Sequence, residues 1–363
     1  MGVGVNMTSN TVLKKENPIK KFLSIRGVGQ VVTVTIGLII MAVVFSFLNP
    51  NFFSAGNMRN ISRQVVPYIL IGVAQSYVLI TGNIDLSIGS VVGMSTMMSA
   101  TFMQNGYSPL VAILVTMATS LAFGFLNGQL VARFKLPPFI ATLGTMTVCR
   151  GIAQLVNNNR NTGVISPGDK EGFFKNLFYD GNAFGIYNGF IIAIIMFAIF
   201  TFFLYKTKAG KHIFAIGSNI EAAKLSGVNV VSTTVVAYMV SAFLSCITGF
   251  VICAATGTGT MDAGNTFELY AVAASVIGGV STLGGSGLLF GTLVGAFIWI
   301  VLENGLQFAR VPTAYKNIII GIIVVVSVLL DVIFRSGSNM NLFKKIGTNM
   351  FGVKDKGNDA TKG

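Results

Sequence analysis

The chain has 363 residues, of which 53% are hydrophobic and only 10% are charged, and its mean hydropathy is +0.73. Soluble domains usually carry about a quarter charged residues, so this composition excludes an ordinary soluble domain and predicts an integral membrane protein. The net charge is +13, but the basic residues lie in short clusters between apolar runs and form no contiguous stripe, so nucleic-acid binding is not expected.

Apolar stretches long enough to be interpreted as transmembrane helices follow one another along most of the chain. In order they are 29–48, 64–81, 88–103, 110–132, 137–156, 189–205, 231–253, 268–280, 287–305 and 317–334. The third and eighth stretches are short and adjoin glycine-rich breaks. The predicted fold is therefore an all-α polytopic membrane protein of about ten helices, with a transmembrane domain over 29–334.

The basic residues also predict the orientation of the chain. With the N-terminus in the cytoplasm, seventeen of the 25 Lys and Arg residues fall in cytoplasmic segments, seven fall outside, and Arg150 lies within a span. An even number of spans then gives an N-in/C-in topology. Residues 1–28 are expected to form a cytoplasmic N-terminal segment, and 335–363 a cytoplasmic, disordered tail.

A polar, glycine-rich break at 81–90 separates the second apolar stretch from the third. It contains Gly82, Asn83, Asp85, Ser87 and Gly89. A charge at membrane depth costs at least a few kcal/mol, and non-helical backbone is tolerated there only inside protein or beside a water-filled cavity. Two interpretations of the carboxylate stay open: it lines a pathway, or it caps the helix that begins near residue 88.

A second glycine-rich break, at 278–287, contains Gly284 and Gly285. The helix–break–helix pattern of 65–97 thus has a weak echo at 269–297, and paired breaks of this kind are typical of translocation sites in repeat-built transporters. Thr142 and Thr145 are further pathway candidates, although each hydroxyl can instead bond back to its own helix. Arg150 could pair with a carboxylate inside the bundle or extend outward to the membrane surface.

The catalytic motifs of common enzymes are missing from the sequence. It contains no Walker A loop, no G-x-S-x-G elbow and no H-E-x-x-H pair, and it has a single histidine. The three cysteines lie in apolar runs without metal-ligand spacing. Neither enzymatic activity nor a bound metal or cofactor is expected of this chain.

The polar connection at 206–230 carries a short predicted helix. Asn219 is the expected N-cap, Glu221 lies near the positive end of the helix dipole, and Gly227 ends the helix. Small residues around Ala223 form the face expected to dock in a groove on a partner. The alternative is an amphipathic connector that rests on the membrane.

Four ordered motifs resemble those of the membrane permease subunits of bacterial ATP-binding-cassette importers for monosaccharides, of the ribose, galactose and xylose type. The first three motifs occupy residues 82–90, 138–146 and 221–229, and the last is 268–274 followed by 277–281 and 284–287. The resemblance runs from about residue 30 to 334. Asn83 departs from the residues more usual before Ile-Asp-Leu-Ser, which leaves the solute open. Permeases for branched-chain amino acids, nucleosides and autoinducer-2 share the general plan.

The resemblance implies a set of partners and a role for the 206–230 connection. The expected coupling residues, which fit a cleft of the ATPase subunit, are Glu221, Ala222, Ala223, Lys224, Leu225, Ser226, Gly227 and Val228. The resemblance further implies four kinds of partner. They are a cytoplasmic ATPase that uses the ATP, an extracytoplasmic sugar-binding protein, a second copy of the chain or a paralogous permease, and membrane lipid. The rival class is a secondary transporter driven by an ion gradient, which would usually place several ionisable groups at midplane.

Overall fold

The computed structural model describes residues 28–165, 169–180, 182–183 and 186–335. The expected N-terminal segment, apart from Val28, and the expected tail, apart from Arg335, lie outside these residues. The first half of the chain forms α2 (Val28–Leu48), the 3₁₀ turn η1 (Pro50–Phe53), α3 (Ala55–Ile80), α4 (Ile88–Gln104), α5 (Pro109–Ala132) and α6 (Pro138–Leu155). The second half forms α8 (Asn188–Lys206), α9 (Lys208–Ser218), α10 (Ile220–Leu225), α11 (Val230–Thr256), α12 (Phe267–Ile277), α13 (Leu289–Phe308) and α14 (Thr313–Arg335).

Every apolar stretch of the sequence coincides with a helix, which confirms the all-α class. Among the residues that the structure describes, six helices are long and apolar enough to cross a membrane: Val31–Leu48 within α2, and α3, α5, α8, α11 and α13. Within the described residues, α12 and Thr313–Leu329 of α14 are shorter apolar helices. The chain is therefore a multi-pass membrane protein.

Local sequence explains where several helices begin and end. The hydroxyl oxygens of Ser54 and Ser108 accept hydrogen bonds from the third residue of α3 and α5, and Asn229 caps α11 in the same way. Proline occupies the first position of α5 and α6, where its missing N–H is not needed. Gly257 ends α11 in the left-handed conformation.

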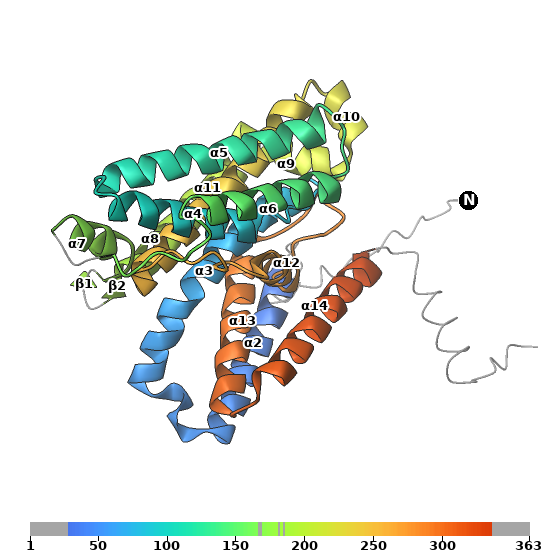
Figure 1. Cartoon of the computed structure of the whole chain (residues 1–363). Coiled ribbons are helices and arrows are strands. Elements are labelled where there is room, and N and C mark those ends of the chain that lie inside the picture. Colours follow the sequence, from blue (N-terminus) through green and yellow to red (C-terminus); the bar gives the residue numbers. More distant parts are fainter. Residues whose placement is uncertain (1–27, 166–168, 181, 184–185, 336–363) are drawn as a thin grey trace, which may run out of the picture.

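The helices form two groups that share α3 (Figure 1). In one group, α11 packs against α4 and α5, and α6 packs against α4; in the other, α13 packs against α2 and α3, and α14 lies beside α12. Large apolar side chains are exposed on the outer faces of α2, α5 and α14, such as Ile39, Leu114 and Ile322. Exposed apolar faces on helices of this length suit contact with lipid.

Two polar connections contain more structure than the sequence predicts. The connection after residue 206 contains α9 in addition to the expected short helix. The polar segment before α8 contains α7 (Asp169–Lys175), a π turn η2 (Asn176–Asp180) and the antiparallel strands β1 (Asn182–Ala183) and β2 (Ile186–Tyr187). These two regions lie at opposite ends of the α4–α5–α11 group (Figure 1).

Candidate functional site at the two helix breaks

The two glycine-rich breaks meet, although they lie far apart in the sequence. The amide of Gly285 donates a hydrogen bond of 2.9 Å to the carbonyl oxygen of Ile80, at the end of α3. A Cβ atom placed on Gly284 would lie 2.9 Å from the Cα atom of Gly82. Gly82, Gly284 and Gly285 all have φ between +69° and +87°, a conformation that L side chains rarely adopt. The breaks therefore touch through backbone atoms.

The C-terminal end of α9 lies against the same place. A Cβ atom on Gly217 would overlap the carbonyl oxygen of Ile80 and lie 2.5 Å from the amide nitrogen of Gly285. The hydroxyl of Ser218 donates a hydrogen bond of 3.4 Å to the carbonyl oxygen of Gly285. We call Gly82, Gly217, Gly284 and Gly285 the glycine junction. Close-packed backbone leaves little free volume between α9 and the two breaks.

The helix α10 follows α9 directly and has the predicted local structure. The Asn219 side chain accepts a hydrogen bond of 2.9 Å from the amide of Ala222, and Glu221 forms an ion pair of 2.6 Å with Lys224. Gly227, with φ of +81°, follows the last turn.

The exposed side of α10 differs from the side that the sequence suggests. Ala223 is only 5% exposed, so its side chain lies inside the protein, whereas Leu225 is 90% exposed. Glu221, Ala222, Lys224, Ser226 and Gly227 are also exposed, and Val228 is half-buried. A large apolar side chain at the exposed tip of a short helix is a surface suited to contact with another protein.

Asp85 lies in the first break and is only 2% exposed. Its Oδ1 atom accepts hydrogen bonds from the amide of Ser87 at 2.9 Å and from the hydroxyl of Ser87 at 2.6 Å. Its Oδ2 atom accepts a hydrogen bond of 2.7 Å from the hydroxyl of Ser241 in α11. The carboxylate thus holds the turn that leads into α4 and ties it to α11.

The hydrogen bonds continue from Ser87 into α5 and α6. The Asn127 amide nitrogen donates to the Ser87 hydroxyl at 3.0 Å, and the Thr145 hydroxyl donates to the Asn127 carbonyl oxygen at 2.7 Å. We call Asp85, Ser87, Asn127, Thr145 and Ser241 the Asp85 network; all five are buried. The hydrogen bonds thus run from Thr145 through Asn127 and Ser87 to the Asp85 carboxyl group, which also accepts from Ser241.

The remaining candidates have other surroundings. The Thr142 hydroxyl donates to the carbonyl oxygen of Pro138 in its own helix at 2.8 Å, which is the alternative that the sequence left open. The Asn83 side chain donates to the hydroxyl of Thr81 at 2.7 Å. Gly89 is buried at the start of α4, where a Cβ atom would lie 2.5 Å from Oε2 of Glu268.

Arg150 contacts main-chain oxygens of the chain between α11 and α12. Its Nη1 atom donates hydrogen bonds to the carbonyl oxygens of Met261 at 2.9 Å and Ala263 at 2.8 Å. Within the described part of the chain, the ion pairs are Lys224–Glu221 and Lys175–Asp180, so Arg150 does not pair with Asp85.

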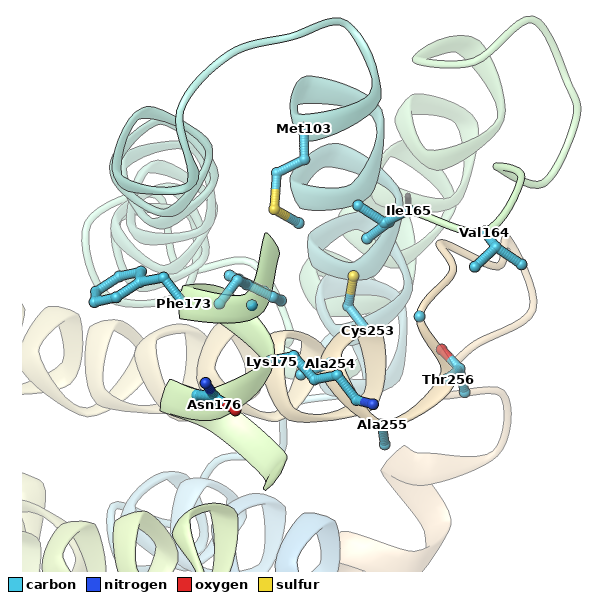
Figure 2. Close-up of a pocket in the computed structure, with 13 residues that line it drawn as sticks. Met103, Val164, Ile165, Phe173, Lys175, Asn176, Cys253, Ala254, Ala255 and Thr256 are labelled. Atoms are coloured by element: carbon cyan, nitrogen blue, oxygen red, sulfur yellow. The ribbon is translucent and has the colours of Figure 1, made fainter. Parts of the chain in front are cut away.

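A cavity of about 760 Å³ opens at the other end of the helix group, where α4 and α11 end near α7 (Figure 2). Its wall is mostly apolar and includes Met103, Ile165, Phe174 and Cys253. Lys175, which also lines the cavity, is already paired with Asp180 at 2.8 Å. The cavity shares no residue with the glycine junction or the Asp85 network.

Three residues of the site were not singled out from the sequence: Gly217, Asn127 and Ser241. The apolar stretch 110–132 contains only two amide side chains, Asn127 and Gln129. A polar amide in such a stretch was a signal by which Asn127 could have been found. Ser241 and Gly217 carry no comparable signal, because serine and glycine are common in membrane helices.

A multi-pass helical bundle with broken helices, a buried polar network and a glycine junction to a polar connection has the features of a membrane transport protein. The family model described as the permease component of branched-chain amino acid transport systems matches residues 57–328, and the chain belongs to this family of transport-system permeases.

Individual relatives extend the similarity over most of the chain. It is 36% identical over 313 residues to the ribose import permease protein RbsC of Bacillus subtilis, covering 86% of this chain and 96% of the relative. It is 33% identical to the ribose import permease protein RbsC of Escherichia coli K12, over 82% of this chain and 92% of the relative. It is 31% identical to the fructose import permease protein FrcC of Rhizobium meliloti, over 81% of this chain and 83% of the relative. No solved structure matches the chain.

Proposed function

We propose that this chain is the permease subunit of an ATP-binding-cassette importer that carries a monosaccharide, of the ribose or galactose type, across the bacterial cytoplasmic membrane. Membership of the permease family supports the transport role, and the names of the relatives, which are ribose and fructose import permeases, support a sugar as the solute. The chain itself needs no cofactor, because ATP is used by the partner ATPase subunit.

The observation that carries this proposal is the arrangement of α9 and α10. The glycine junction connects α9 to both breaks, and α10 exposes Leu225 at the far side of α9. An ATPase that binds α10 could therefore move both breaks when it closes on ATP. The residues Glu221 to Val228 provide the coupling surface, apart from the buried Ala223.

The proposed topology has ten membrane passes, one of them made by α12 together with the non-helical residues before it, and both termini lie in the cytoplasm. This places α9 and α10 on the cytoplasmic side, with the ATPase, and α7 and the β1–β2 hairpin on the outer side, with the sugar-binding protein. The separation of these two regions at opposite ends of the helix group supports this orientation (Figure 1). A second copy of the chain, or a paralogous permease, completes the pathway, and membrane lipid covers the exposed apolar faces.

Reconstituted uptake tests the proposal. The chain is co-expressed with the ATPase and the binding protein encoded beside it, and the complex is placed in liposomes. We expect uptake of labelled ribose, fructose or galactose that requires ATP and the binding protein. Uptake driven by an ion gradient without ATP would instead identify an ion-coupled secondary transporter. ATP-dependent uptake of autoinducer-2, a nucleoside or a branched-chain amino acid would keep the importer class and replace the sugar.

A further inference from the structure

A third non-helical stretch, between α11 and α12, runs through residues 257–266. We call it the α11–α12 segment. It contains Thr258, Thr260, Asp262, Asn265 and Thr266, so it is a polar connection between two apolar helices.

The α11–α12 segment follows α4 from its outer part to its first turn. A Cβ atom on Gly259 would lie 2.8 Å from the Cβ atom of Ala100. The hydroxyl of Thr96, one turn further along, donates to the carbonyl oxygen of Thr260 at 3.2 Å. Gly264 then packs against the backbone of Gly89 so closely that neither residue has room for a side chain.

These contacts place the segment at membrane depth. An α-helix rises 1.5 Å per residue, so the distance along α4 from Ala100 to Gly89 is about 16 Å. With 27 residues, α11 is about 40 Å long and is able to cross a hydrocarbon core of about 30 Å before the segment begins. The segment therefore turns back into the bundle, and α12 begins at the level of the Asp85 network.

One side of the segment is fixed to the protein. Arg150 holds the carbonyl oxygens of Met261 and Ala263, and Gly93 leaves the room for its guanidinium group, since a Cβ atom there would lie 2.5 Å from Nη1. On the outer half, the amide of Gly259 donates to the Thr162 hydroxyl at 2.7 Å. Arg150 is thus a positioning residue for the segment.

The other side of the segment is exposed and polar. Asp262, Asn265 and Thr266 are exposed, and Glu268 in the first turn of α12 is half-buried. A carboxylate that faces lipid at this depth is strongly disfavoured. Irregular backbone at membrane depth is found where it is covered by protein or lines a water-filled cavity. The exposed side of the segment therefore does not face lipid.

We infer that the exposed side of the α11–α12 segment lines the water-filled part of the translocation pathway, where Asp262 and Asn265 contact the hydroxyl groups of a neutral, polyhydroxylated solute. A carboxylate accepts hydrogen bonds from hydroxyl groups, and an amide both donates and accepts them. The solute class rests on the proposed function, whereas the water-filled position of the segment rests on the geometry alone.

Cysteine labelling in the assembled transporter tests the position of the segment. Asp262→Cys and Asn265→Cys are treated in membranes with a charged methanethiosulfonate reagent, which reacts with the ionised thiol and so requires water. Leu114→Cys, on the apolar outer face of α5, is the lipid-facing control, and Arg160→Cys, in the polar segment before α7, is the water-facing control. The unsubstituted chain gives the background, because its three cysteines are buried.

We expect Asn265→Cys and Asp262→Cys to react within about 10-fold of the rate of Arg160→Cys and about 100-fold faster than Leu114→Cys. Modified Asn265→Cys should lose ribose uptake, and modified Arg160→Cys should keep it. If both segment variants react as slowly as Leu114→Cys, with and without ATP, the segment is covered by a second copy or by lipid and the inference is wrong, even where uptake is normal. If both segment variants react rapidly but the transporter does not carry ribose, fructose or galactose, the segment lines the pathway and the proposed solute class is wrong.

Discussion

The amide of Gly285 is hydrogen-bonded to the carbonyl oxygen of Ile80, so the loop after α12 is joined to the end of α3. The end of α9 covers this bond, because Gly217 lies against both of the residues that form it. The three segments come from different parts of the sequence and meet through main-chain atoms. This contact connects the exposed helix α10 to the interior of the bundle.

Gly217→Ala tests the glycine junction. The added methyl group would overlap the Ile80 carbonyl oxygen, and overpacking of this kind costs about 1–3 kcal/mol. We expect ATP-driven uptake to fall by roughly 10-fold or more as the breaks are displaced, while the ATPase still co-purifies. Gly144→Ala in α6 is the matched control, since a Cβ atom there meets nothing within 4 Å. Equal uptake by the two variants would remove the junction from the mechanism.

Leu225→Ser tests the exposed tip of α10. Because Leu225 is 90% exposed, the substitution should leave the thermal stability of the isolated chain unchanged. Loss of a buried apolar anchor from an interface costs about 1–3 kcal/mol, so ATPase retained in pull-downs should decrease roughly 5- to 150-fold. Phe173→Ser, at an exposed site on the opposite end of the bundle, should retain the ATPase. If Leu225→Ser retains it equally well, this tip is not the docking surface.

Asp85→Asn and Asp85→Ala separate hydrogen bonding from charge. Asparagine keeps one acceptor for Ser87, and its amide group can donate to the Ser241 hydroxyl oxygen. Alanine leaves the amide and the hydroxyl of Ser87 and the hydroxyl of Ser241 without their acceptor, at about 1–3 kcal/mol for each unsatisfied group. We expect a clear decrease in Tm for alanine and a small one for asparagine, with near-normal uptake for asparagine. Loss of uptake in an assembled, ATP-hydrolysing Asp85→Asn complex would show that the negative charge takes part in transport.

Thr145→Val and Thr142→Val compare two threonines on one helix. Thr145 donates to Asn127 in the Asp85 network, whereas Thr142 bonds only to its own helix in the contacts that the structure shows. Valine keeps the shape of threonine and removes the hydroxyl. We expect Thr145→Val to lose about 1–2 kcal/mol of unfolding free energy, because it leaves the Asn127 oxygen without its donor. Thr142→Val should lose less than about 0.5 kcal/mol, and denaturant unfolding in detergent measures both.

The purified chain without partner subunits should not hydrolyse ATP, because its sequence lacks a phosphate-binding Walker A loop. Phosphate release should appear only after the ATPase subunit is added back. Hydrolysis that persists after every partner has been removed, and that co-elutes with the chain in gel filtration, would contradict the importer assignment.

The sequence predicted the apolar helices well, because long apolar stretches leave few other solutions in a membrane. It did not predict α9, since Gly210 and Gly217 and the basic residues of that stretch resemble a loop. In the structure these glycines permit close packing, while Ile213 and Ile216 are buried. Tertiary contacts, rather than helix propensity, therefore stabilise α9.

The sequence also did not predict which side chains of α10 point into the protein. The face around Ala223 was expected to dock in a groove on a partner, but Ala223 faces the interior, so a charge placed there by Ala223→Glu would disturb the packing of α10 itself. The polar residues of the first break were recognised, yet their connection through Asn127 and Ser241 depends on how four segments pack. Short polar motifs indicate where a site lies, and the packing decides which groups meet.

The main-chain character of the glycine junction has a consequence for how such permeases diversify. Because the contact uses no side-chain chemistry, its fit depends on the absence of side chains at a few positions and not on matching residues elsewhere. Under the proposed function, substitutions along the α11–α12 segment can then alter solute preference without disturbing the contact that links α9 to the two breaks. Permeases with the same glycine junction could thus work with one type of ATPase subunit and transport different solutes.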